Sequence, residues 1–148
     1  MIPLFVLIVG SIIFRLLGWL GVASFANRQT SLRGGLACMF LVTASAHWGR
    51  RRPDLMLMVP ARFGPAGLIV TVTGILEIAG AIGLLIPATV QLAAMGLALL
   101  LIAMFPANIQ AVRRNISIAG SKPTPLAIRA PLQIVFILAT LVAGGFIW

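Results

Sequence analysis

The chain has 148 residues, of which 61% are apolar and only 9% are charged, and its mean hydropathy is +1.13. This composition is typical of a polytopic membrane protein and excludes a soluble globular domain. The net charge of +9 does not indicate nucleic-acid binding, because the basic residues flank apolar runs and do not cluster on one polar face.

Five apolar runs pass or nearly pass the length of roughly 20 residues that a helix needs to cross the hydrocarbon layer. In chain order they are residues 3–25, 31–48, 64–86, 90–112 and 126–148. The third and fourth runs are separated by a turn of only a few residues, so their helices should be antiparallel neighbours. We therefore expect an all-α fold, a polytopic membrane helix bundle of five spans that forms a single transmembrane domain over residues 1–148.

The distribution of basic residues between the loops predicts the orientation of this bundle. Five helices divide the loops into two sets, and the basic side chains divide eight to two between them. One set holds Arg28 and Arg33, and the other holds Arg50, Arg51, Arg52, Arg62, Arg113, Arg114, Lys122 and Arg129. Because basic loops stay in the cytoplasm, we expect a cytoplasmic amino terminus and a carboxyl terminus outside.

Two opposite charges lie inside predicted spans, Arg15 in the first and Glu77 in the third. At ~1.5 Å per residue, both lie roughly 18 to 20 Å from the cytoplasmic ends of their helices. Charges inside a membrane are costly unless they are paired, so we expect an ion pair between Arg15 and Glu77. This pair either pins two helices together or holds Glu77 as a group that handles a proton or anchors a ligand.

A second polar layer is predicted near the cytoplasmic face, where His47, Asn108 and Gln133 could converge. Histidine suits proton exchange near neutral pH, and the two amides can hold a ligand carbonyl or hydroxyl. The alternatives are an interfacial role for His47 beside Trp48 and a simple interhelical hydrogen bond for Gln133. Glu77 and His47 are the candidates for catalysis, and all these polar residues together with Arg15 are candidates for ligand binding. We expect no cofactor and no metal site, since three or four ligands are not available at one depth.

Two further features concern the loops and the fourth span. Pro106 should free the carbonyl of Ile102, and Asn108 is placed to satisfy the loosened backbone. The segment that begins with Arg50, Arg51 and Arg52 is too short to cross the membrane. We expect it to lie in the headgroup zone above His47, with its arginines on lipid phosphates.

Several short motifs from residue 31 to the end resemble the DoxX-like family of small bacterial membrane proteins. They are Arg33, Ala46-His47, Met58-Val59-Pro60, Thr73-Gly74-Ile75-Leu76-Glu77, Phe105-Pro106-Ala107-Asn108 and Arg129-Ala130-Pro131-Leu132-Gln133. The resemblance implies a four-helix core to which residues 3–25 are an amino-terminal addition. It also implies a bacterial cytoplasmic membrane and a link to quinol oxidation or to thiol systems. Cys38 stands alone, so a thiol relay within the chain is not supported.

Three functions from different classes are compatible with these features. The first is a nonenzymatic membrane subunit or assembly partner, redox- or quinone-associated. The second is a binding protein for a small apolar molecule such as a quinone, isoprenoid or sterol-like compound, and the third is an isomerase or cyclase acting on such a molecule. Expected partners are membrane lipids, other membrane proteins or a small apolar ligand, and no nucleic acid. A filled interior would favour the first function, and a cavity among the helices would favour the others.

Overall fold

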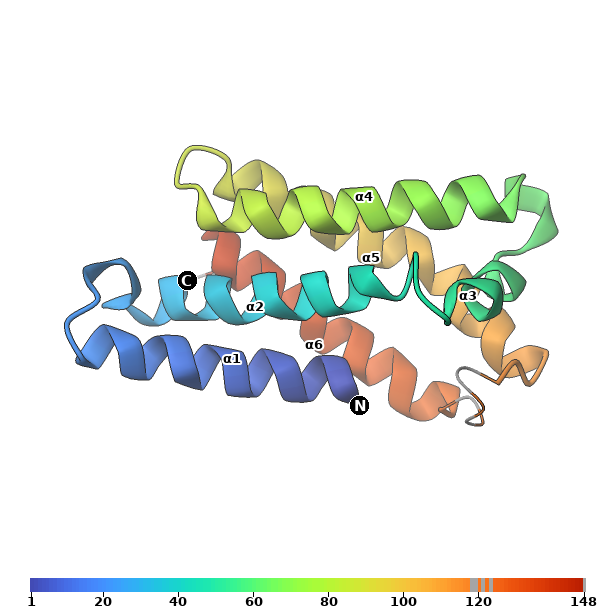
Figure 1. Cartoon of the computed structure of the whole chain (residues 1–148), viewed down its shortest axis with the longest axis horizontal. Helices are drawn as coiled ribbons and strands as arrows, with labels where there is room; N and C mark the ends of the chain where they lie inside the picture. Colours follow the sequence, from blue (N-terminus) through green and yellow to red (C-terminus); the bar gives the residue numbers. More distant parts are fainter. Residues whose placement is uncertain (118–119, 121, 123, 148) are drawn as a thin grey trace.

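A computed structural model describes residues 1–117, 120, 122 and 124–147, and this part of the chain is helical, with no strand. The predicted all-α class is therefore confirmed. Figure 1 shows the helices as a bundle of long rods with a short helix across one end. The α-helices are α1 (Ile2–Trp19), α2 (Arg28–Ser45), α3 (Arg52–Met58), α4 (Ala66–Leu85), α5 (Val90–Arg113) and α6 (Leu126–Gly144), and the 3-10 helices are η1 (Ala23–Phe25) and η2 (Ala61–Phe63).

Among the described residues, four helices are long and apolar enough to cross a membrane, namely α1, α4, α5 and α6. They indicate an integral membrane protein. The second predicted span corresponds to α2, which does not reach the same apolarity because it carries polar residues such as Arg28, Gln29 and Arg33. Length and composition therefore identify four spans among the described residues, where five were expected.

The polar residues of α2 are accommodated because this helix lies at the centre of the bundle. It packs against α1, α4 and α6, and side chains such as Leu36 and Phe40 are fully enclosed in the core. At the end of the bundle where α2 begins, Gln29 Nε2 donates to the carbonyl of Val142 at 2.9 Å, and Arg33 Nε donates to that of Ala143 at 2.8 Å. These donors add partners to carbonyls in the last turn of α6, where Val142 also accepts from the amide of Gly145 at 3.0 Å.

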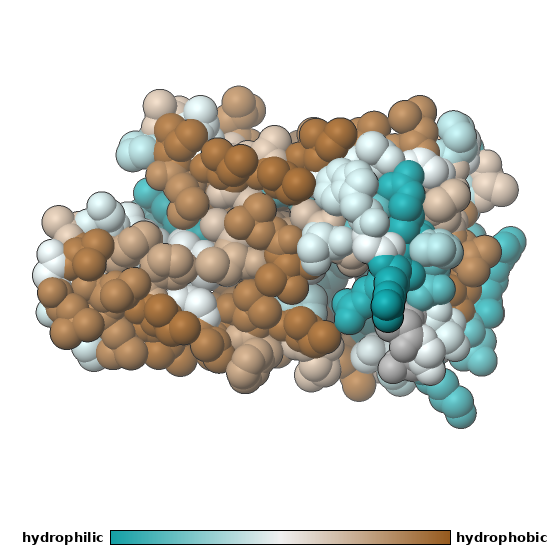
Figure 2. Space-filling view, in the orientation of Figure 1, coloured by the Kyte–Doolittle hydropathy of each residue, from teal (hydrophilic) through white to brown (hydrophobic). Residues whose placement is uncertain are grey.

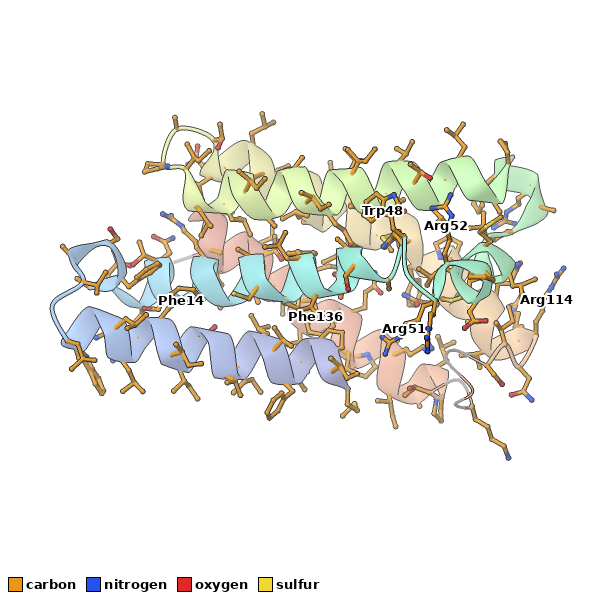
Figure 3. The ribbon with its side chains drawn as sticks, viewed as in Figure 1. Phe14, Trp48, Arg51, Arg52, Arg114 and Phe136 are labelled. Atoms are coloured by element: carbon orange, nitrogen blue, oxygen red, sulfur yellow. The ribbon has the colours of Figure 1, made fainter. Side chains whose placement is uncertain are left out.

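The close contact between α1 and α2 depends on glycine. A Cβ atom on Gly35 would lie 2.7 Å from the backbone nitrogen of Ser11 and 2.8 Å from the carbonyl of Leu7. Only a residue without a side chain allows the two backbones to approach so closely. Phe14 packs between the same two helices (Figure 3).

The first helix is shorter than the predicted run of residues 3–25. It ends at Trp19 because Gly21 adopts a left-handed φ of 99° and η1 follows. The side chain of Asn27 then accepts a hydrogen bond from the amide of Thr30 at 2.7 Å and caps the start of α2. At the other end of the chain α6 ends at Gly144, and Trp148, the end of the fifth predicted run, lies outside the described residues.

The helices do not begin at a common plane. The amino terminus lies near the middle of the bundle, and α1 runs from there toward the end at which α2 begins (Figure 1). Consistently, Met1, Pro3 and Leu4 line a groove with Asn108 and Gln133, which lie inside α5 and α6.

Basic side chains gather at the end of the bundle that is farthest from the connection between α1 and α2. We call it the basic end, and it consists of α3, η2, the end of α5 and the start of α6. Figure 2 shows hydrophilic residues there and an apolar surface over most of the remainder of that face. Arg51, Arg52 and Arg114 all lie at this end (Figure 3). The loops that connect α2 to α4 and α5 to α6 are therefore on the same side of the bundle, as the predicted division of the basic residues requires.

Candidate ligand cavity at the basic end

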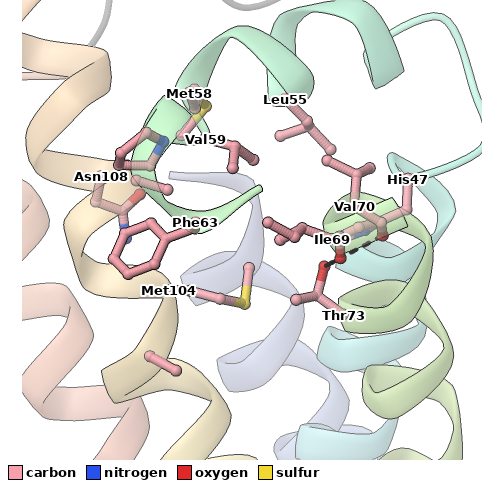
Figure 4. A pocket seen from close by; sticks show the side chains of 13 residues that line it. His47, Leu55, Met58, Val59, Phe63, Ile69, Val70, Thr73, Met104 and Asn108 are labelled. Carbon is pink, nitrogen blue, oxygen red and sulfur yellow. Dashed lines mark hydrogen bonds between the residues drawn. The ribbon is translucent and has the colours of Figure 1, made fainter. Parts of the chain in front are cut away.

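A cavity of about 370 Å³ lies beneath α3 and η2, between α4 and α5 (Figure 4). Its walls are mostly apolar, with side chains that include Leu55, Met58, Phe63, Val70 and Met104. Three polar residues also line it, His47, Thr73 and Asn108. The volume falls in the range of ~300 to 1,000 Å³ that is typical of small-molecule sites. Two of the predicted site residues, His47 and Asn108, therefore face one common space.

His47 lies just beyond the end of α2 and is only 4% exposed. Its Nδ1 atom is 3.3 Å from the carbonyl of Thr43. Because a carbonyl only accepts hydrogen bonds, Nδ1 carries the proton, and Nε2 of the neutral ring is left as an acceptor. Burial is the main cause that lowers the pKa of His47, and the positive charge of Arg52 acts in the same direction. The ring is therefore neutral near pH 7.

Room for His47 is provided by a glycine on the facing helix. A Cβ atom on Gly74 would lie 2.8 Å from Cβ of His47 and 2.7 Å from Cη2 of Trp48. The rings of His47 and Trp48 have centroids 6.1 Å apart. Trp48 therefore lies beside His47, as an interfacial role for the histidine would require, but the side chain of His47 lines the cavity.

Arg52 holds one side of the roof over the cavity. Its guanidinium donates to the carbonyl of His47 at 2.7 Å, to the carbonyl of Gly67 at 3.0 Å and to Oγ1 of Thr71 at 2.9 Å. These bonds join the end of α2, the start of α3 and the first turns of α4. The expectation that Arg52 lies on lipid phosphates is therefore wrong, because two backbone carbonyls and the hydroxyl of Thr71 hold its guanidinium against the protein.

The other side of the roof is held by Gln110 of α5. Its Nε2 atom donates to the carbonyls of Leu57 and Val59, both at 3.1 Å. The segment from α3 to η2 is therefore tied to α4 through Arg52 and to α5 through Gln110. A roof that is attached on both sides gives the cavity a fixed shape.

Glu77 is only 3% exposed and does not line the cavity. Its Oε2 atom lies 2.9 Å from the hydroxyl of Thr43, which is also 3.0 Å from the carbonyl of Phe40. Thr43 thus contacts Glu77 through its hydroxyl and His47 through its carbonyl. It joins the two residues that we considered for catalysis, without bringing them into one space.

The predicted ion pair between Arg15 and Glu77 is wrong. Nη1 of Arg15 donates to the carbonyl of Ala26 at 2.5 Å, and its Cζ lies 5.4 Å from the ring centroid of Trp19. Arg15 shares a groove with Ser31 in the first turns of α2, whereas Glu77 is level with Thr43 near the end of that helix. The separation along α2 is roughly 18 Å at the rise of an α-helix.

Asn108 and Gln133 meet as predicted, on the side of α5 that faces α6. Asn108 Nδ2 donates to Gln133 Oε1 at 2.9 Å, and Asn108 Oδ1 accepts from Nη1 of Arg129 at 3.0 Å. Gln133 in turn donates to the carbonyl of Leu101, one turn before Pro106. Asn108 Nδ2 donates to Gln133 and not to the carbonyl of Ile102, which Pro106 frees, so the expected role of Asn108 beside the proline is wrong. Gln133 itself lies behind Asn108 and outside the cavity wall.

Sequence reasoning missed Thr43 and Arg52, and a signal existed for each. Thr43 lies four residues before His47, and on the helix predicted for residues 31–48 the two would share one face. Arg52 begins a short helix directly after the turn that follows α2, where free carbonyls are available. No three His, Cys, Asp or Glu side chains among the described residues lie close enough together to hold a metal ion.

Residues 36–143 match the model of a family described as a domain of unknown function, DUF8561. The chain belongs to this family. The DUF8561 region includes every helix around the cavity and most of α2, whereas α1 and Arg15 lie outside it. No curated protein and no solved structure matches the chain. The cavity with His47 and Asn108 therefore belongs to the family region, and the contact of Arg15 with Ala26 does not.

Proposed function

We propose that this protein binds a small, mostly apolar molecule within the membrane, in the cavity beneath α3 and η2. The observation that supports this proposal most strongly is the cavity itself, which combines apolar walls with polar groups on opposite sides. His47 comes from the α2 side, and Asn108 comes from α5 (Figure 4). This combination is typical of sites in which apolar contact supplies affinity and a few polar groups fix orientation.

The polar groups define the chemistry of the ligand. Nε2 of His47 accepts a hydrogen bond, so it favours a hydroxyl or N–H group on the ligand. The side chain of Asn108 is held in place by Gln133 and Arg129, and Nδ2 has a second hydrogen for a ligand carbonyl or hydroxyl. A group that is already oriented loses little entropy when a ligand binds. The ligand is then an apolar molecule with a donor at one side and an acceptor at the other.

Quinol- or isoprenoid-like molecules and sterol-like alcohols have this character, which agrees with the resemblance to DoxX-like proteins. We prefer a binding function to the purely structural role of a nonenzymatic subunit, and the cavity supports this preference. An isomerase or cyclase is less well supported, because Glu77 lies outside the cavity wall and contacts Thr43. We therefore propose binding without catalysis.

We further propose that α2 crosses the membrane together with the four apolar helices, which gives the five spans of a DoxX-like core with one additional helix. The basic end would face the cytoplasm of a bacterial cell, because basic loops are retained there. The ligand would then enter from the cytoplasmic half of the bilayer. The exposure of Ala103 and Phe63 at the cavity wall provides an opening in that region.

The test is purification in mild detergent followed by mass spectrometry of small molecules that co-purify. Ala107 lines the cavity, and Ala107→Phe should fill part of it. Ala127 is exposed on α6 and does not line the cavity, so Ala127→Phe is the matched control. We expect one apolar species to be enriched with the wild type and the control and to be lost from Ala107→Phe.

The same species at equal abundance in all three samples would contradict the proposal. The absence of any enriched species from the wild type, relative to membranes without the protein, would also contradict it. Thermal unfolding of each variant is measured in the same samples, because a variant that has lost its fold would also lose the ligand.

A further inference from the structure

A second hollow, distinct from the cavity, opens on the outer side of η2. This groove has a volume of about 600 Å³ and lies between η2 and the last turns of α5. Arg62 from η2 and Arg113 and Arg114 from the end of α5 line it, and we call these residues the arginine groove. Pro106 and Ile109 form an apolar part of the lining at the membrane side.

The geometry of the arginine groove is fixed by contacts outside it. Gln110 donates to the carbonyls of Leu57 and Val59 and so holds the segment before η2 against α5. The guanidinium of Arg62 lies 4.9 Å from the ring centroid of Phe63, which restricts its motion. The fold therefore brings Arg62 next to Arg113 and Arg114, although about fifty residues separate it from them in the sequence.

The chain cannot neutralise this groove by itself. It has eleven basic residues and only two acidic ones, Asp54 and Glu77. Glu77 is buried against Thr43, so it is not available at the surface. Asp54, the other acidic residue, can offset at most one of the three positive charges. The remaining charge favours an external anion, and guanidinium groups match phosphate oxygens in geometry.

We propose that the arginine groove binds the phosphate of an anionic phospholipid. The lipid is favoured over a soluble phosphate because the same groove has an apolar part in Pro106 and Ile109, both on α5, which is apolar enough to cross a membrane. A lipid places its phosphate on the arginines and its glycerol and first methylenes on this apolar part. The site is separate from the cavity, so it stands or fails independently of the proposed function.

The test uses the full chain in a nonionic detergent, titrated with phosphatidylglycerol or with phosphatidylcholine of the same acyl chains. Native mass spectrometry reports the affinity for the first bound lipid. The groove variant is Arg62→Gln/Arg113→Gln/Arg114→Gln. The control variant, Arg28→Gln/Arg50→Gln/Arg51→Gln, also removes three positive charges, but from residues that do not line the groove. Five basic residues remain in the loops of the basic end of the groove variant, so the predicted orientation is kept.

Each arginine beside an anionic headgroup contributes a factor of about five to binding, so the groove variant should bind phosphatidylglycerol about 100-fold more weakly. The control variant should lose less than about fivefold. Affinity for phosphatidylcholine should change little in either variant. If the groove variant does not fold, the three single variants replace it, and each should lose about fivefold.

Two results would overturn the proposal. An equal loss in the groove and control variants would show that the overall charge attracts lipid and that no specific site exists. Displacement of phosphatidylglycerol by millimolar inorganic phosphate, with the same dependence on the three arginines, would assign the groove to a soluble phosphate.

Discussion

The hydroxyl of Thr43 lies 2.9 Å from Oε2 of Glu77, and this contact joins α2 to α4 below the cavity. Thr43 is thus the side chain that donates a hydrogen bond to the buried carboxyl group of Glu77. Nδ1 of His47 is 3.3 Å from the carbonyl of the same threonine. Thr43 therefore contacts both Glu77 and His47, and neither Thr43 nor Glu77 lines the ligand cavity.

Removal of this hydroxyl should destabilise the bundle. Thr43→Val keeps the shape of the side chain, and the lost hydrogen bond should cost about 1 kcal/mol. A double-mutant cycle with Glu77→Gln, measured by equilibrium unfolding in mixed micelles, should give a coupling of about 0.5 kcal/mol or more. The matched cycle pairs Arg15→Leu with Glu77→Gln and should be additive within about 0.5 kcal/mol. Strong coupling in the second cycle would restore the ion pair that the structure excludes.

The position of His47 should depend on the absence of a side chain at residue 74. Gly74→Ala introduces a methyl group 2.8 Å from Cβ of His47, which cannot move away without its backbone. We expect a loss of about 1 to 3 kcal/mol in unfolding free energy. Gly96→Ala is the control, because no heavy atom lies within 4 Å of the new methyl group. Its stability should stay unchanged or rise by up to about 1 kcal/mol. Equal losses in the two variants would contradict this account.

Stability should decrease in mild acid because of His47. Burial lowers the pKa of this residue from its ordinary value of 6.5 in the folded protein. The unfolded chain therefore binds a proton at a pH where the folded protein does not, and stability rises with pH in that window. We expect little contribution above pH ~6.5 and a loss that grows below it, at up to about 1.4 kcal/mol per pH unit.

The measurement compares thermal unfolding of the wild type and His47→Gln between about pH 7.5 and pH 5.5. The variant retains every other titrating group, so the difference between the two curves reports His47 alone. A difference that is independent of pH would mean that His47 has no lowered pKa in the folded protein.

The stability of the roof over the cavity should depend far more on Arg52 than on the adjacent Arg51. Arg52→Met loses three hydrogen bonds from a charged donor and should destabilise the protein by about 2 to 3 kcal/mol. It should also increase protease cleavage between α2 and α4. Arg51 is exposed, so Arg51→Met should change stability by less than about 0.5 kcal/mol. Similar effects of the two substitutions would mean that the arginines act only through their charge.

The helical class and the antiparallel pair of α4 and α5 could be predicted from apolar runs of sufficient length and from the short turn after Leu85. The contact of Asn108 with Gln133 also followed from counting residues, because both lie near the same end of adjacent helices. Such counting works where two helices start or end at a common plane.

The pairing of Arg15 could not be predicted in this way. Counting residues gives the depth of Arg15 relative to the start of α1, and that start lies near the middle of the bundle (Figure 1). The offset is set by the packing of α1 on Gly35 of α2, which is a tertiary contact. Thr43 was missed for a different reason: a threonine in an apolar helix is common, and its partner becomes evident only when α2 and α4 are side by side.

The enclosure of α2 by other helices also constrains how the chain enters the bilayer. A segment that contains Arg28, Gln29 and Arg33 partitions poorly into hydrocarbon when it is alone, because each such residue adds to the free energy of insertion. Docking on α1 removes its glycine face from lipid, and the last turn of α6 later receives Gln29 and Arg33. Under the proposed topology, in which α2 crosses the membrane, we expect its integration to be cooperative and to be completed only after α6 has been synthesised.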